Sequence, residues 1–159
     1  MSIDSIELWH KRARPNPTEK DFDVQLGCHL EEIVEMIAAL RFTHKNGSGV
    51  EMPGKNSMLY QQINDFADGL KAGRITAQIA NRKELVDALA DQVVTAVGVG
   101  HTADMNTARA VHVVNTSNWS KFSPEGQPYF DQNGKILKGP NYVPPMSLKT
   151  QKYRLREMN

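Results

Sequence analysis

Hydrophobic residues recur at intervals of three to four positions along much of this chain, which is the spacing of an amphipathic helix. The clearest such stretches span residues 20–44, 57–71, 82–99 and 103–117. The third stretch is rich in valine, but it is too long for one strand and its apolar positions do not alternate. The pattern therefore predicts four main helices, with a fifth left open.

Capping residues and glycines suggest where these helices begin and end. Ser57 is a candidate N-cap for the second helix, and Gly73 is a candidate stop signal. Gly98 is expected to end the third helix, and the fourth is expected to start at Thr102 or Asp104.

Glycine and proline interrupt the helical pattern in two places. The segment 45–56 is predicted to be a loop, and proline and glycine recur from Ser117 onward. Asn133–Gly134 is typical of a tight turn between short extended segments. We expect an all-α fold, a four- to five-helix bundle with an irregular C-terminal arm and few strands. One domain is expected over 1–159, and it would consist of a helical core at about 20–117, a substrate-binding arm at about 118–146 and a basic tail at 147–159.

Composition and charge narrow the function classes. The chain has 159 residues, of which 40% are hydrophobic, and its formal net charge is +1. Such a balance provides no global field to attract nucleic acid or a membrane surface, so neither partner is expected. No segment approaches the roughly 18 apolar residues of a membrane-spanning helix. The single cysteine, Cys28, excludes an internal disulfide and favours a reducing, cytoplasmic setting.

Acidic side chains gather on two of the predicted helices. They are Glu31, Glu32 and Glu35 on the first, and Glu84, Asp87 and Asp91 on the third. Residues three or four apart share one helix face, so antiparallel packing of the two helices would bring several carboxylates together. Clustered carboxylates raise one another's pKa unless a cation neutralises them, and hard oxygen ligands favour Mg²⁺, with Mn²⁺ as a substitute.

A second interpretation of the same acids is open at this point. Glutamate is a good helix former, and pairs of acids three residues apart are common on solvated helix faces. The spacing by itself does not decide between a metal site and a solvated face.

Two blocks of sequence together resemble one known family. The runs LEEIVE at 30–35 and ELVDALAD at 84–91 resemble the ExxE…ExxD signature of the all-α nucleoside triphosphate pyrophosphatases, the MazG-like enzymes. The runs SNWSKF at 117–122 and GKILKGPNYVPP at 134–145 resemble the SNxSK…GKxxKGPNYxPP tail of a MazG-like subgroup frequent in phages and bacteria. The resemblance covers about residues 20–146. It departs from the family at Trp119, where the subgroup usually has Met, and in its long gap between the acidic motifs.

The resemblance implies a metal-dependent hydrolase. Glu32, Glu35, Glu84 and Asp87 would be the catalytic Mg²⁺ ligands, while Asp91 and Glu31 would be further direct or outer ligands. A metal-bound water would attack between the α- and β-phosphates of a nucleoside triphosphate, and the products would be a nucleoside monophosphate and pyrophosphate. Relatives that act on phosphoribosyl-ATP or an alarmone are an alternative, as is a helical interaction module without catalysis.

The arm would supply contacts to the nucleotide. Lys121 and Lys138 suit phosphate oxygens, Asn118 and Asn141 suit the sugar or base, and Tyr142 suits stacking on a base. Members of the family usually assemble as homodimers or homotetramers, so we expect a homo-oligomer. The subgroup occurs in phages and bacteria, so we expect the protein in the cytoplasm of a bacterial or phage-infected host cell.

Overall fold

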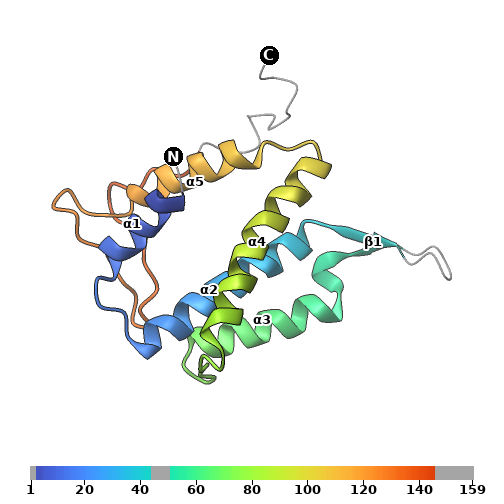
Figure 1. The fold of residues 1–159 in the computed structure, drawn as a ribbon, viewed down its shortest axis with the longest axis horizontal. Helices are drawn as coiled ribbons and strands as arrows, with labels where there is room; N and C mark the ends of the chain where they lie inside the picture. The colour runs from blue at the N-terminus through green and yellow to red at the C-terminus, as the bar shows by residue number, and fades with distance from the viewer. Residues whose placement is uncertain (1–2, 44–50, 146–159) are drawn as a thin grey trace, which may run out of the picture. The chain divides into compact units, whose positions relative to one another are not determined.

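The computed structural model describes residues 3–43 and 51–145, and these residues are mostly helical (Figure 1). Their helices are α1 (Ile3–Ala13), α2 (Glu19–Ala38), α3 (Met58–Lys71), α4 (Arg82–Thr102) and α5 (Thr107–Trp119). Their strands are β1 (Arg41–Thr43) and β2 (Glu51–Pro53), which pair antiparallel and lead into a 3₁₀ turn, η1 (Gly54–Asn56). The prediction of an all-α fold with little strand is confirmed. The basic tail at 147–159 lies outside the described residues.

The predicted boundaries of α3 are confirmed. The Ser57 hydroxyl accepts a hydrogen bond from the Tyr60 backbone N–H at 3.1 Å, which satisfies one of the donors left open at a helix start. After the helix, Gly73 adopts a φ of +70°, a conformation that glycine reaches without steric cost. Local capping chemistry therefore determined both ends of this helix.

The prediction that the first helix extends to residue 44 is wrong. α2 ends at Ala38, and Arg41–Thr43 form a strand in which Phe42 lies opposite Met52. The backbone groups of Arg41–Thr43 bond to β2 instead of continuing the helix. The spacing of apolar residues within one segment contains no information about a pairing strand elsewhere in the chain. The predicted loop at 45–56 likewise contains β2 and η1 in its second half, while residues 45–50 lie outside the described part.

The connection between α4 and α5 also differs from expectation. α4 continues through Gly98 to Thr102, because an internal glycine costs only about 1 kcal/mol relative to alanine. α5 starts later than expected, with Asn106 as its N-cap, and Asp104 lies in the connection at a φ of +56°. The helix that the sequence did not place is α1, at the N-terminus.

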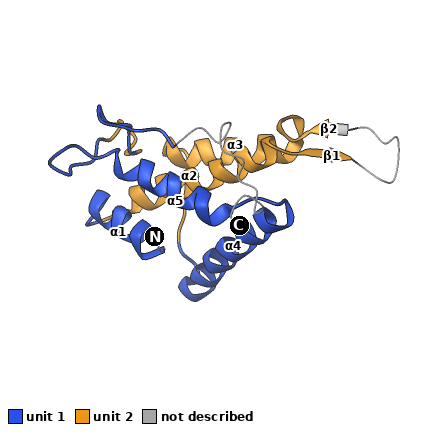
Figure 2. Cartoon of the chain, turned by 90° about the horizontal axis from the view of Figure 1, so that it is seen from above, with its two compact units in different colours: residues 1–16, 79–129, 136–159 blue, residues 17–78, 130–135 orange. Residues whose placement is uncertain are grey.

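The chain forms two compact units, which Figure 2 shows in different colours. Unit 1 comprises residues 1–16, 79–129 and 136–159, and unit 2 comprises residues 17–78 and 130–135. The expected arm at 118–146 is thus divided between them, with the turn at 130–135 in unit 2. The expectation of a single domain stays a prediction.

Unit 2 is built on the packing of α2 against α3. The buried side of α2 carries Val24, Gly27, Val34 and Ile37, and the buried side of α3 carries Ala67 and Leu70. Gly27 allows the helices to approach closely: a Cβ there would lie 2.8 Å from the Ala67 carbonyl oxygen and 2.7 Å from Lys71 Cγ.

Gly27→Ala is expected to destabilise the protein by up to about 2 kcal/mol. Overpacking a helix contact costs roughly 1–3 kcal/mol, and the better helix propensity of alanine returns about 1 kcal/mol. Gly98→Ala is the matched control, because a Cβ at Gly98 on α4 meets nothing within 4 Å. That change should stabilise the protein by about 0.5–1 kcal/mol. Urea unfolding of both variants checks the opposite signs, and equal shifts would contradict the close contact.

Unit 1 has a small aromatic core. Trp9 and Ala13 of α1 pack against Phe122, and Trp119 and Ile136 adjoin them. The Trp9 indole Nε1 donates a hydrogen bond to the Asn118 carbonyl oxygen at 2.8 Å. The N-terminal helix therefore packs against the end of α5 and the start of the arm.

Candidate functional site

Glu32 and Glu35 lie exposed on α2, one turn apart and away from the helix side that α3 covers. Because Val34 and Ile37 occupy the buried side, the two glutamates are left on the solvent-facing side of the helix. Sequence reasoning placed these two residues on one face, and the helix supplies that face.

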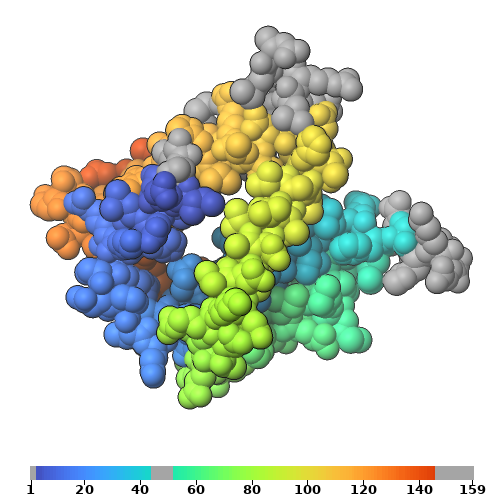
Figure 3. Space-filling model, in the orientation of Figure 1, coloured from blue at the N-terminus to red at the C-terminus, as the bar shows by residue number. Residues whose placement is uncertain are grey.

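Glu84, Asp87 and Asp91 lie exposed on α4. The first turn of this helix is fixed by the Asn81 side chain, whose Oδ1 accepts hydrogen bonds from the backbone N–H groups of Lys83 and Glu84. Apolar side chains of α4 are exposed as well, and Figure 3 shows this helix uncovered along the visible face in yellow-green. The acids therefore share α4 with a large apolar surface.

The two acidic pairs belong to different units, Glu32 and Glu35 to unit 2 and Glu84 and Asp87 to unit 1. Within residues 3–43 and 51–145, no group of three or more His, Cys, Asp or Glu side chains is gathered to hold a metal ion. Convergence of the four carboxylates stays a prediction.

Glu31 makes two ion pairs within unit 2. Its Oε1 lies 3.2 Å from Lys71 Nζ of α3, and its Oε2 accepts from Lys135 Nζ at 2.9 Å. Burial alone would raise the pKa of Glu31, but hydrogen bonds from Lys135 and Lys71 outweigh burial and place this pKa below its ordinary value. Both carboxylate oxygens of the residue expected as an additional metal ligand are thus occupied by ammonium groups.

The two lysines are affected in the opposite direction. Burial would lower the pKa of Lys71, but hydrogen bonds to Asp68 and Glu31 raise it above its usual value. The hydrogen bond to Glu31 likewise raises the pKa of Lys135. All three partners are therefore held in their charged forms, and the pairs join α2, α3 and the 130–135 turn.

Glu31→Gln is expected to cost about 1 kcal/mol of folding stability at neutral pH, the scale of a partly exposed ion-pair network. The folded-state pKa of Glu31 is depressed, so its contribution is complete above the ordinary pKa of 4.5 and is lost as the pH falls through the lower folded-state pKa. The difference between variant and wild type should therefore vanish in acid. Urea unfolding across pH checks this, with Glu19→Gln on the same helix as control; a pH-independent difference would contradict the ion pairs.

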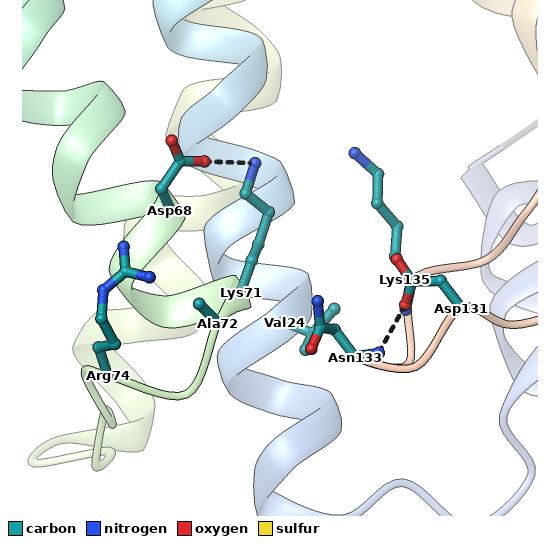
Figure 4. Close-up of a pocket in the computed structure, with 8 residues that line it drawn as sticks. All are labelled: Val24, Asp68, Lys71, Ala72, Arg74, Asp131, Asn133 and Lys135. Carbon is teal, nitrogen blue, oxygen red and sulfur yellow. Dashed lines mark hydrogen bonds and ion pairs between the residues drawn. The ribbon is translucent and has the colours of Figure 1, made fainter.

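An open pocket of about 380 Å³ lies beside this network, entirely within unit 2 (Figure 4). Its lining residues are Val24, Asp68, Lys71, Ala72, Arg74, Asp131, Asn133 and Lys135. Figure 4 shows the ammonium groups of Lys71 and Lys135 extending toward the same end of the pocket from α3 and from the turn. The sequence did not predict that Lys71, Arg74 and Lys135 line one pocket. Lys135 stands within the GKILKGPNYVPP run and could have been found there. Lys71 and Arg74 belong to no motif.

The arm residues predicted to bind substrate lie in unit 1. Lys121 Nζ lies 5.7 Å from the centroid of the Trp9 ring, and Lys138 Nζ lies 5.1 Å from that of Tyr142. Asn118 contributes its carbonyl oxygen to the Trp9 hydrogen bond, and Asn141 is exposed. Both lysines thus rest on aromatic faces, and their role toward phosphate stays a prediction.

Hydrogen bonds fasten the end of the arm to α5. The hydroxyls of Ser117 and Ser120 donate to the Val143 carbonyl oxygen at 2.7 and 3.3 Å, and the Val143 N–H donates back to Ser120 Oγ at 2.8 Å. A largely apolar pocket of about 430 Å³ opens between α5 and residues 143–145. The SNWSKF run and the end of the GKILKGPNYVPP run therefore lie together.

Comparison with known proteins leaves the family unassigned: no protein-family model, curated protein or solved structure matches this chain. No helix among the described residues has the length and apolar character needed to cross a membrane.

Proposed function

We propose that this protein is a Mg²⁺-dependent nucleoside triphosphate pyrophosphohydrolase, which cleaves a ribo- or deoxyribonucleoside triphosphate to the monophosphate and pyrophosphate. One observation carries the proposal: two acid pairs with i, i+3 spacing lie exposed on two separate helices of an all-α chain, in the order of the MazG-like signature. The SNWSKF and KGPNYVPP runs of the arm add support.

The donor chemistry of the acid pairs fits magnesium. Glu32 and Glu35 offer only carboxylate oxygens, as do Glu84 and Asp87, and Mg²⁺ binds through one or two carboxylates together with waters and substrate phosphates. Mn²⁺ suits the same oxygen ligands. The proposal requires the two pairs to meet, either within one chain or between copies.

The proposed reaction adds water across the bridging bond between the α- and β-phosphates. Glu32, Glu35, Glu84 and Asp87 would hold the metal, which would neutralise phosphate charge and activate water for attack. A carboxylate of this set orients the attacking water and accepts its proton. Asp91, one turn beyond Asp87 on α4, is positioned to extend the set.

In the proposed complex the arm orients the nucleotide. Lys121 and Lys138 bind phosphate oxygens, and Asn118 and Asn141 bind the sugar or base. One face of the Tyr142 ring carries Lys138, so a stacked base would take the opposite face.

Homo-oligomerisation is part of the proposal, as a dimer or tetramer. Exposed apolar side chains follow α4, including Val86, Leu89, Val93, Val94 and Val97. A surface of this kind marks an interaction site more often than free solvent contact. The same observation favours a second candidate function, a helical interaction module without catalysis.

A substrate panel tests the proposal. The protein is incubated with each NTP and dNTP, with phosphoribosyl-ATP and with an alarmone, in Mg²⁺, in Mn²⁺ and in EDTA, and pyrophosphate is measured. Metal-dependent release of pyrophosphate from a triphosphate supports the pyrophosphohydrolase, and release from phosphoribosyl-ATP or the alarmone alone supports those alternatives. Absence of release from every substrate would overturn the enzyme in favour of the interaction module.

A further inference from the structure

We call the pocket lined by Lys71, Arg74 and Lys135 the Lys71–Lys135 pocket. Its side chains offer more unused hydrogen-bond donors than unused acceptors. Three cationic side chains reach it from the end of α3, the loop after α3 and the 130–135 turn. Two acids, Asp68 and Asp131, line it as well, and Glu31 adjoins it through its ion pairs with the two lysines. Formal charge alone therefore does not decide what the pocket binds.

Of the six carboxylate oxygens that Glu31, Asp68 and Asp131 bring to the pocket, five have a hydrogen-bond or ion-pair partner among the described residues. Both oxygens of Glu31 pair with lysines, and Asp68 Oδ1 pairs with Lys71 at 3.0 Å while its Oδ2 accepts from Asn64 at 3.4 Å. Asp131 Oδ1 accepts the backbone N–H groups of Asn133 and Lys135, both at 2.8 Å, and so closes the turn. These acids are committed to holding the walls together.

The cationic groups keep donors unused. An ammonium group has three N–H donors, and Lys71 uses two on carboxylates while Lys135 uses one. The guanidinium of Arg74 has five donors and makes no ion pair or side-chain hydrogen bond with any residue of the described chain. Among residues 3–43 and 51–145, Arg74 is thus the one of these three cations without a carboxylate partner.

We propose that the Lys71–Lys135 pocket is a binding site for a small phosphate-bearing anion, such as pyrophosphate or the phosphate chain of a nucleotide. A ligand rich in acceptor oxygens and carrying two or more negative charges matches the unused donors of Arg74, Lys135 and Lys71. Guanidinium groups bind phosphate through two parallel hydrogen bonds, and lysines add compact charge. A volume of about 380 Å³ has room for such a group. The proposal goes beyond the hydrolysis proposed above, because it needs neither a metal ion nor turnover.

Isothermal titration calorimetry with pyrophosphate in EDTA tests this site. Wild-type protein should bind saturably, and Arg74→Gln should weaken binding at least about tenfold, the scale of a lost charge-assisted contact. Because Arg74 is exposed and its guanidinium makes no ion pair or hydrogen bond with the described residues, its replacement should leave the circular dichroism spectrum unchanged. Arg82→Gln is the matched control: Arg82 is an exposed arginine at the start of α4 that does not line the pocket, so its loss should change affinity less than twofold.

Several results would overturn the proposal. No saturable binding of pyrophosphate to the wild-type protein would do so, as would equal losses in Arg74→Gln and Arg82→Gln, which would indicate nonspecific charge attraction. Titrations with inorganic phosphate, pyrophosphate and a nucleoside diphosphate distinguish the sources of the phosphate: tighter binding of the diphosphate assigns the pocket to nucleotides, and tighter binding of pyrophosphate assigns it to the free anion. Wild-type protein should bind pyrophosphate in EDTA whether or not it releases pyrophosphate from any triphosphate, so failure of the hydrolase proposal leaves this result unaffected.

Discussion

Glu35→Gln is expected to reduce metal-dependent pyrophosphate release by at least about a thousandfold, which corresponds to roughly 4 kcal/mol of transition-state stabilisation. The amide keeps the shape of the side chain but removes the negative charge that a Mg²⁺ ligand must supply. Glu35 is exposed on α2, so folding stability should change by no more than about 0.5 kcal/mol. Activity and stability should therefore separate in this variant.

The measurement is the initial rate of pyrophosphate release from the best substrate of the panel, with urea unfolding measured in parallel. Glu19→Gln makes the same chemical change at the start of the same helix, outside the acidic motif, and should retain full activity. If Glu35→Gln keeps more than a tenth of the wild-type rate, the assignment of Glu35 as a metal ligand is wrong. The titration of wild type and variant with Mn²⁺ provides a second readout, because the variant should bind the ion more weakly.

Trp9→Ala is expected to destabilise the protein by about 3–5 kcal/mol, the usual cost of replacing a buried tryptophan by alanine. Trp9 is only 5% exposed, and its indole packs against Phe122 while donating a hydrogen bond to the Asn118 carbonyl oxygen. The substitution leaves a cavity and removes the indole hydrogen bond from the Asn118 carbonyl oxygen, which keeps its hydrogen bond from the Lys121 backbone N–H at 3.1 Å. In a protein of this length the melting temperature should fall by roughly 6–20 °C.

Two further variants separate the causes. Leu8→Ala changes the preceding residue, which is 58% exposed, and should alter stability by less than about 0.5 kcal/mol. Trp9→Phe keeps most of the apolar volume but removes the indole N–H, so it should cost an intermediate amount. Thermal unfolding by circular dichroism compares all three. A loss in Trp9→Ala no greater than that in Leu8→Ala would show that the aromatic cluster does not stabilise unit 1.

The fold was predictable where a local signal defined an element. Ser57 and Gly73 mark the two ends of α3, because a capping hydroxyl and a glycine with positive φ act within a few residues of a helix end. The strand at Arg41–Thr43 was not predictable in this way, because its partner β2 follows after a further segment of chain. α1 was missed although Ile6, Trp9 and Ala13 have helical spacing, because a segment of 11 residues shows that spacing for only about three turns.

The candidate site likewise has one part that local spacing predicted and one part that it did not. The acid pairs on α2 and α4 were found from spacing, since three residues along a helix always share a face. The Lys71–Lys135 pocket was not found, because Lys71, Arg74 and Lys135 come from separate segments and none of them forms a pattern with its neighbours. Glu31 shows the difference most clearly. Its sequence position suggested a metal ligand, while its contacts join two lysines.

The helical class, the ends of α3, the turn at Asn133–Gly134 and the sharing of one helix face by each acid pair followed from the residues alone, because helix periodicity, capping and glycine conformations are local properties of the chain. Tertiary structure alone decided that Gly27 brings α2 and α3 into close contact, that Trp9 anchors the start of the arm, and that Glu31 pairs with Lys71 and Lys135. Each of these depends on atoms distant in the chain becoming neighbours, and the free energy of such contacts comes from packing and ion pairing that no single segment contains.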